Sequence, residues 1–469
     1  MIAKAVGFTF YHSIYLFTFA LILLSAYGVY RLLVYINILD ASARALFIAG
    51  YLSCLTILTT ISYAERDHFI AMGLLPFVLA QLSLTWRVQV PRLFLFTVLF
   101  LGVLAILIKP HFGLLPTLLL FHRMIVQRRF LSIVRDTDFI VLAVMSTAYI
   151  SATALFFSDF FTIILPDVLN FYLHYNNPGV VYPRIIKYGL FLLVCLVMVL
   201  FLPHRDERDQ RLKSFLFVLI FGAAICLLVF LIQMKGFYYH LLPLFTFAVP
   251  AFFVVIYLGL KTVAKSKTVG TITSDLLVFT LFLCSYTFKP LLPNYPTHDD
   301  YINAPLSQFI GEECEAPCSF FITHENMEII SQIAFYTGYG YATRFPSYWF
   351  IPGFKSLTDL PEHVTESVAY QERLEEAHKR YAGYVAEDLR RYDTSLLLIM
   401  QNPPHIPEEH AFDYFNFFSL DADFRDITSG YTRTGTFSAD RGYFLRNTKY
   451  DYEYILHWDV YKRRNTEEK

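Results

Sequence analysis

The stretch Ser62–Phe77, "SYAERDHFIAMGLLPF", places four consecutive polar residues between two long apolar runs. These residues, Glu65–His68, bring three formal charges and a histidine to the edge of a run long enough to cross a bilayer. The stretch therefore predicts a membrane boundary and, with it, a helical membrane protein.

The composition of the whole chain agrees with this interpretation. Of the 469 residues, 56% are hydrophobic and 16% are charged, compared with about 25% charged in an average soluble domain. The formal net charge of −1 gives no basic excess for binding nucleic acid, so we expect no such partner. Apolar runs of spanning length stop at about residue 290. We predict a polytopic transmembrane domain over residues 1–290 and an extracytoplasmic soluble α/β domain over 291–469.

Ten apolar runs predict about ten transmembrane helices, the shortest of which contains Pro116. With ten crossings, every loop rich in Lys and Arg falls on one side, which is the cytoplasmic side by the positive-inside rule. These basic loops include the segment from Arg123 to Arg135, and the C-terminal domain falls on the other side. The runs cover residues 8–30, 42–63, 69–86, 93–109, 111–126, 138–158, 184–203, 213–233, 240–260 and 271–289.

Two further segments carry local predictions. Residues 159–187 are aromatic and interrupted by prolines, which predicts an interfacial helix followed by a loop. In the soluble part, "SFFITHE" and "TSLLLIMQ" predict strands, residues 357–391 predict an amphipathic helix, and two terminal strands follow. Cys314 and Cys318 either form a short-loop disulfide or remain free thiols.

Three polar clusters fall on the same predicted outer side of the membrane. Each cluster alone fits side chains that reach for water at a helix end, but together they fit one hydrated cavity. An acid beside a histidine suits a general base or a divalent-cation ligand, and Arg and Lys suit phosphate. This chemistry fits transfer from a phosphate-linked lipid, and it also fits a proton-coupled transporter. The clusters are Glu65–His68, Lys109 with His111, and Lys235 with Tyr239 and His240.

The order of several motifs resembles a known group of proteins. "ERDH" (Glu65–His68), "KPHF" (Lys109–Phe112) and "QMKGFYYHLLP" (Gln233–Pro243) are followed by "YATRFPSYWFIPG", "YDTSLLLI" and "FDYFNFFSLDADF". The series is similar to that of bacterial integral membrane proteins related to the GT-C glycosyltransferases, which include protein mannosyltransferases and aminoarabinose transferases. The resemblance covers almost the whole chain. It implies a GT-C-type membrane domain in the bacterial inner membrane.

The implied activity is transfer of a sugar from a polyprenyl-phosphate-linked donor to an envelope glycan or lipid acceptor. We expect acid, base or divalent-cation roles for Asp67, Glu65 and His68. We expect the donor to be bound by Arg66, Lys109, His111, Lys235, Tyr239 and His240.

The sequence departs from the group's pattern in two ways. Glu65 and Asp67 stand where the group has Gln and Glu. GT-C enzymes also carry a catalytic Asp in a first outer loop, and no such loop precedes "YHSIYLFTFALILL". An upstream segment or a companion membrane subunit would supply it, or the protein is a non-catalytic GT-C-like subunit. An envelope lipid transporter or flippase remains the other alternative.

Overall fold

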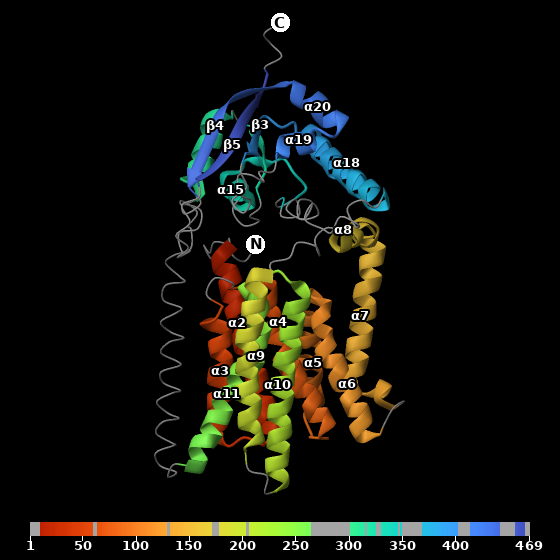
Figure 1. The fold of residues 1–469 in the computed structure, drawn as a ribbon, viewed down its shortest axis with the longest axis vertical. Helices are drawn as coiled ribbons and strands as arrows, with labels where there is room; N and C mark the ends of the chain where they lie inside the picture. Colours follow the sequence, from red (N-terminus) through yellow and green to blue (C-terminus); the bar gives the residue numbers. More distant parts are fainter. Residues whose placement is uncertain are drawn as a thin grey trace. The chain divides into compact units, whose positions relative to one another are not determined.

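The computed structural model describes twelve parts of the chain, and these form two compact units, residues 1–162 with 176–293 and residues 163–175 with 294–469 (Figure 1). Each unit is described by itself. The described residues are 10–59, 63–128, 132–170, 178–202, 206–263, 301–314, 317–324, 330–345, 348, 368–401, 413–440 and 455–464.

The first unit is a bundle of apolar helices, and each predicted run within the described residues overlaps one of them. Among the described helices, six are long and apolar enough to cross a membrane, namely α2, α4, α7, α9, α10 and α11. The chain therefore has the helices of a multi-pass membrane protein. Ten crossings are not confirmed, because α3, α5 and α6 are shorter and residues 271–289 lie outside the described residues. The helices are α2 (Phe10–Ile36), α3 (Ala41–Thr56), α4 (Arg66–Thr85), α5 (Arg92–Ile108), α6 (Leu114–Gln127), α7 (Thr137–Phe156), α9 (Pro178–Leu200), α10 (Glu207–Gln233) and α11 (Leu242–Val263).

Helix α4 is the centre of this bundle. Of the residues in its apolar part, 83% are buried, compared with 6% for α7. It packs against α2, α5 and α11. Small residues let α4 and α5 approach closely, since a Cβ on Gly73 would overlap the Cβ of Ala105 and a Cβ on Gly102 would lie 2.6 Å from the Cβ of Phe77. The stretch that begins with Arg66 therefore forms the core around which the other helices pack.

The segment after α7 forms a π-helical turn, Phe160–Ile164, and the short helix α8, Leu165–Asn170. Arg380 donates two hydrogen bonds to Asp167, at 2.6 and 2.7 Å, and the Tyr381 hydroxyl donates a third at 2.8 Å. These bonds place α8 in the second unit. Helix α9 then begins at Pro178, earlier than the predicted start at residue 184.

The second unit contains a five-stranded mixed sheet with the order β2-β1-β3-β5-β4. Strands β1, β2 and β3 are parallel, whereas β5 is antiparallel to both β3 and β4. Every residue of β3 is buried, as expected for an apolar run inside a sheet. The predicted strands in this unit are confirmed. The strands are β1 (Ser319–Ile322), β2 (Gly340–Tyr341), β3 (Leu396–Met400), β4 (Tyr431–Asp440) and β5 (Ile455–Arg463).

Helices and one disulfide complete this unit. Helix α18, Val368–Arg391, confirms the amphipathic prediction over its described part, while residues 357–367 lie outside the described residues. Cys314 and Cys318 form a disulfide with a Cα–Cα distance of 5.5 Å. The shorter helices are α14 (Pro305–Glu313), α15 (Ile330–Thr337), α19 (Tyr414–Phe418) and α20 (Ala422–Ser429).

Candidate functional site

The three polar clusters of the sequence each contribute one side chain to a buried triad in the first unit. The Lys109 Nζ donates to Asp67 Oδ2 at 2.5 Å and lies 3.0 Å from His240 Nδ1. His240 Nδ1 lies 3.5 Å from Asp67 Oδ1. Asp67 is fully buried, and Lys109 and His240 are 8% and 4% exposed. Asp67 and Lys109 are 42 positions apart in the chain, and Lys109 and His240 are 131 positions apart, but their side chains meet.

Local sequence explains how Lys109 reaches this point. Pro110 follows it, and a residue before proline is pushed out of the helical region. Lys109 accordingly has an extended backbone, φ −139° and ψ 93°, and ends α5. The chain then makes the 3₁₀ turn η1, Pro110–Gly113, before α6 begins. The "KPHF" motif is therefore a helix end that turns a lysine inward.

His240 is placed by a turn between α10 and α11. Met234 and Gly236 have φ values of 51° and 74°, which reverse the chain after Gln233. The Arg184 side chain of α9 donates to the Gly236 carbonyl. A Cβ at Gly236 would lie 3.0 Å from Val180 Cγ1, so glycine suits this position both in conformation and in space. The 3₁₀ turn η5, Tyr238–Leu241, follows and carries His240.

His68 lies apart from the triad, although it is next to Asp67 in sequence. The Ala64 backbone N–H donates to its Nδ1 at 3.1 Å, and its Nε2 lies 2.9 Å from the Leu55 carbonyl oxygen. Nδ1 therefore accepts, and Nε2 carries the proton and donates. Both nitrogens of this buried ring are used, so His68 anchors the turn at Ala64, whose φ is 64°.

The remaining predicted site residues differ in burial and in their contacts. Arg66 is exposed and Glu65, the N-cap residue that precedes α4, is half-buried. The Tyr239 ring lies 5.6 Å from Lys109 Nζ, a cation–π distance. His111 is exposed, and its Nε2 lies 3.3 Å from the amide nitrogen of Gln233. Lys235 is buried, and this burial lowers its pKa to about 8.

Two atoms of the triad remain available for a ligand. Lysine has donors only, so His240 Nδ1 accepts from Lys109 and the proton of the neutral ring resides on Nε2. This Nε2 and Asp67 Oδ1 are buried and have no hydrogen-bond partner among the described residues. Unpaired buried polar atoms are costly. The triad thus offers one acceptor and one donor to an incoming hydroxyl or phosphate.

The triad does not fit a divalent cation. In the described parts of the chain, no group of three or more His, Cys, Asp or Glu residues could hold a metal ion. Between Asp67 and His240, the Lys109 ammonium already supplies the positive charge. Divalent metal sites need several oxygen or nitrogen ligands, which these residues do not supply.

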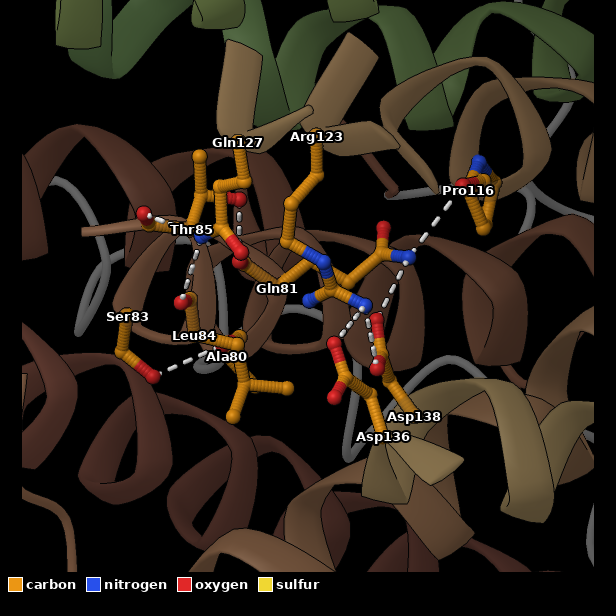
Figure 2. Close-up of polar contacts among 10 residues, drawn as sticks. All are labelled: Ala80, Gln81, Ser83, Leu84, Thr85, Pro116, Arg123, Gln127, Asp136 and Asp138. Carbon is orange, nitrogen blue, oxygen red and sulfur yellow. Dashed lines mark hydrogen bonds and ion pairs between the residues drawn. The ribbon is translucent and has the colours of Figure 1, made fainter. Parts of the chain in front are cut away.

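A second buried polar cluster lies near the other end of α4 (Figure 2). Arg123 of α6 donates to Asp138 Oδ1 at 2.7 Å and lies 3.3 Å from Asp136 Oδ2. The Gln81 side-chain amide of α4 donates to Asp138 Oδ2 and to the Pro116 carbonyl, each at 3.2 Å. Arg123 and Asp138 are 1% and 0% exposed. These bonds join α4, α6 and the first turn of α7.

The sequence analysis assigned Arg123 to a basic cytoplasmic loop, and its placement in a loop is wrong. Arg123 lies inside α6 and is paired with a carboxylate. The available signal was Asp138 at the start of an apolar run, because a charge there needs a partner.

No known protein family matches the chain, and no curated protein matches it either.

Proposed function

We propose that the protein is a membrane glycosyltransferase that moves a sugar from a polyprenyl-phosphate-linked donor to an envelope glycan or lipid. The observation that supports this proposal is the buried triad, in which Asp67 Oδ1 lacks a partner among the described residues. Lys109 holds the other carboxylate oxygen at 2.5 Å and so orients Oδ1. A carboxylate that is fixed in orientation and shielded from water is suited to take a proton from an acceptor hydroxyl.

In the proposed reaction, Asp67 accepts the hydroxyl proton while the acceptor oxygen attacks the anomeric carbon of the sugar. The bond between that carbon and the phosphate oxygen breaks, and its electron pair leaves with the lipid phosphate. His240 Nε2–H and the ammonium groups of Lys109 and Lys235 stabilise this charge through hydrogen bonds and electrostatic attraction. Arg66, exposed beside the triad, meets the phosphate from the solvent side.

The direct test is the Asp67→Asn variant. Asparagine keeps the size of the side chain and an oxygen for Lys109 but cannot accept the proton, so we expect transfer to fall about 10²–10⁴-fold. The measurement is transfer of radiolabel from a polyprenyl-phospho-sugar to an envelope extract, with purified protein in liposomes. Asp159→Asn, at an exposed position, is the matched control. Full transfer by Asp67→Asn would refute the assigned role.

A lipid transporter driven by protons is the second candidate, because α4 carries buried polar groups near both of its ends. A relay along α4 would need titratable groups between them. The intervening residues of α4, from Phe69 to Ala80, include none, and for this reason we favour the transferase. Lipid flux in vesicles without label transfer would instead support the transporter. If the protein shows neither lipid flux nor label transfer, this result would support a non-catalytic subunit.

The pH dependence of transfer tests the role of Lys235. A lysine with its pKa lowered to about 8 is protonated below that pH and neutral above it. Donor binding should therefore weaken as the pH rises through about 8, since the phosphate loses a positive partner. In the Lys235→Arg variant the guanidinium stays charged to about pH 12, so the alkaline fall in kcat/KM should move to higher pH. Initial rates between about pH 6 and pH 10 measure this. An unchanged alkaline fall in kcat/KM would exclude a role for Lys235 in binding the donor phosphate. The control is Lys187→Arg, at an exposed site.

A further inference from the structure

A pair of parallel aromatic rings lies beside the triad, on the turn that carries His240. The Phe237 and Tyr239 rings have centroids 5.3 Å apart and planes inclined by 7°, so they stack. The Tyr239 ring lies 4.4 Å from the His240 ring and 5.6 Å from Lys109 Nζ. The Phe237 ring lies 5.7 Å from the His240 ring. These contacts join the aromatic pair to two members of the triad.

Phe237 is the more exposed ring of the pair. It is 40% exposed, whereas Tyr239 is half-buried and His240 is 4% exposed. The backbone fixes its position, because Phe237 is the N-cap residue of η5 and its carbonyl accepts from the His240 backbone N–H at 3.3 Å. Phe237 therefore presents an aromatic surface at a fixed place beside the imidazole of His240.

An exposed phenyl ring of this kind selects a ligand with an apolar, flat surface. It has no hydrogen-bonding atom, and its electron-rich face attracts groups that carry a partial positive charge. The C–H groups on one face of a pyranose sugar meet both conditions. In β-glucose all substituents are equatorial, so each face of the sugar ring presents only C–H groups. A phosphate gains nothing from such a ring, and the aromatic pair thus complements the charged triad.

The distance from the triad suits a sugar that is bonded to a phosphate. The anomeric carbon is two covalent bonds from phosphorus, which places the centre of the sugar roughly 4 Å from the phosphorus atom at about 1.5 Å per bond. The His240 Nε2 has no partner among the described residues and is the donor assigned to the phosphate. With the Phe237 ring 5.7 Å from the imidazole, a sugar on that phosphate is within reach of the phenyl face.

We propose that Phe237 binds the sugar of the donor by stacking on one face of the pyranose ring while the triad binds the phosphate. This inference rests on the proposed function and makes it more specific, because it assigns the recognition of the sugar to one residue and selects sugars that have a C–H face. Phe237 determines which donor binds and takes no part in breaking the bond.

The test compares two probes that differ only in the sugar, farnesyl phosphate and farnesyl phospho-β-glucose. Each probe displaces a fluorescent isoprenyl phosphate from the purified protein in detergent micelles, which gives a Kd for each probe and the ratio of the two. Phe237→Leu keeps an apolar side chain but has no flat ring, and Phe237→Tyr restores the ring. Phe157→Leu is the matched control, at a 69% exposed phenylalanine that follows α7.

We expect the wild type to bind the glucose-bearing probe more tightly than farnesyl phosphate. Phe237→Leu should weaken binding of the glucose-bearing probe about three- to tenfold, the range expected for losing one stacked ring face. The Kd for farnesyl phosphate should stay within about twofold of the wild-type value. Phe237→Tyr and Phe157→Leu should keep both wild-type Kd values.

Three results would overturn the inference. A wild type without preference for the glucose-bearing probe has no sugar site at this ring. An unchanged Kd ratio in Phe237→Leu would leave the ring only the role of an aromatic anchor at the membrane surface. Equal weakening of both probes would show that the ring holds the turn and not the sugar.

The proposed function is decided separately, by the transfer assay of Asp67→Asn. Active transfer with an unchanged Kd ratio in Phe237→Leu would keep the transferase and reject the role of Phe237. Sugar-dependent binding that Phe237→Leu abolishes, in a protein that transfers no sugar, would keep the sugar site and reject the transferase.

Discussion

Arg123→Met is expected to lower the free energy of unfolding by about 3–5 kcal/mol, the cost of leaving a buried carboxylate without its partner. Asp138 is fully buried, and without Arg123 its remaining side-chain partner is the Gln81 amide at 3.2 Å. Few residues of α7 are buried, and Asp138 is one of them. The first turn of α7 should therefore detach from α4 and α6. Unfolding of the protein in detergent micelles by added SDS, followed by circular dichroism, measures the change.

The double variant Arg123→Met with Asp138→Leu separates the charge from the packing. Replacing both members of a buried ion pair with apolar residues is often neutral or stabilising. The double variant should thus recover most of the lost stability. Asp136 is 19% exposed and can reach water, and the Gln81 amide still donates a hydrogen bond to the Pro116 carbonyl. Arg128→Met, at an exposed position near the end of α6, should change stability by no more than about 0.5 kcal/mol. A double variant as unstable as the single one would show that the contacts of Arg123, and not its charge, hold the helices.

Lys109→Met should have an effect of similar size, about 3–5 kcal/mol, by leaving Asp67 buried without its ammonium. The nearest remaining side chain of the triad is His240, whose Nδ1 lies 3.5 Å from Asp67 Oδ1. Proton uptake by Asp67 would relieve the unpaired charge, so the loss of stability should be larger at pH 8 than at pH 5. The same SDS titration, repeated at the two pH values, tests this.

The combination of Lys109→Met with Asp67→Asn distinguishes stability from function. With the carboxylate gone, the double variant should regain stability and lose its pH dependence, while sugar transfer should remain absent. Lys187→Met removes an exposed cation and serves as the control for both measurements. Recovery of transfer in the double variant would contradict the proposed role of the triad.

Local sequence determines the elements of both units. A run of apolar residues such as the one after His68 has one favourable structure in a membrane, because a helix satisfies its backbone hydrogen bonds internally. In the second unit, the continuous apolar run Leu396–Met400 likewise forms a strand within a sheet. Proline also acts locally, as Lys109 shows, since this residue precedes Pro110, has an extended backbone and ends α5.

The pairing of buried charges depends on contacts between helices that are distant in sequence. Asp67 and His68 are adjacent on α4, yet Asp67 joins the triad and His68 bonds to the Leu55 carbonyl and the turn at Ala64. Adjacent residues on a helix point about 100° apart, so only the packing of neighbouring helices decides which of them meets a partner.

Arg123 is a second residue whose partner depends on a helix that comes later in the sequence. As a residue in a basic segment it indicated a cytoplasmic loop, but α7 brings Asp138 to it inside the bundle. The sequence by itself determined the apolar helices, the strands and the short list of polar residues near helix ends. Only the tertiary structure decided which of those residues pair, because the free energy of a buried charge depends on the atoms that surround it and not on its neighbours in the chain.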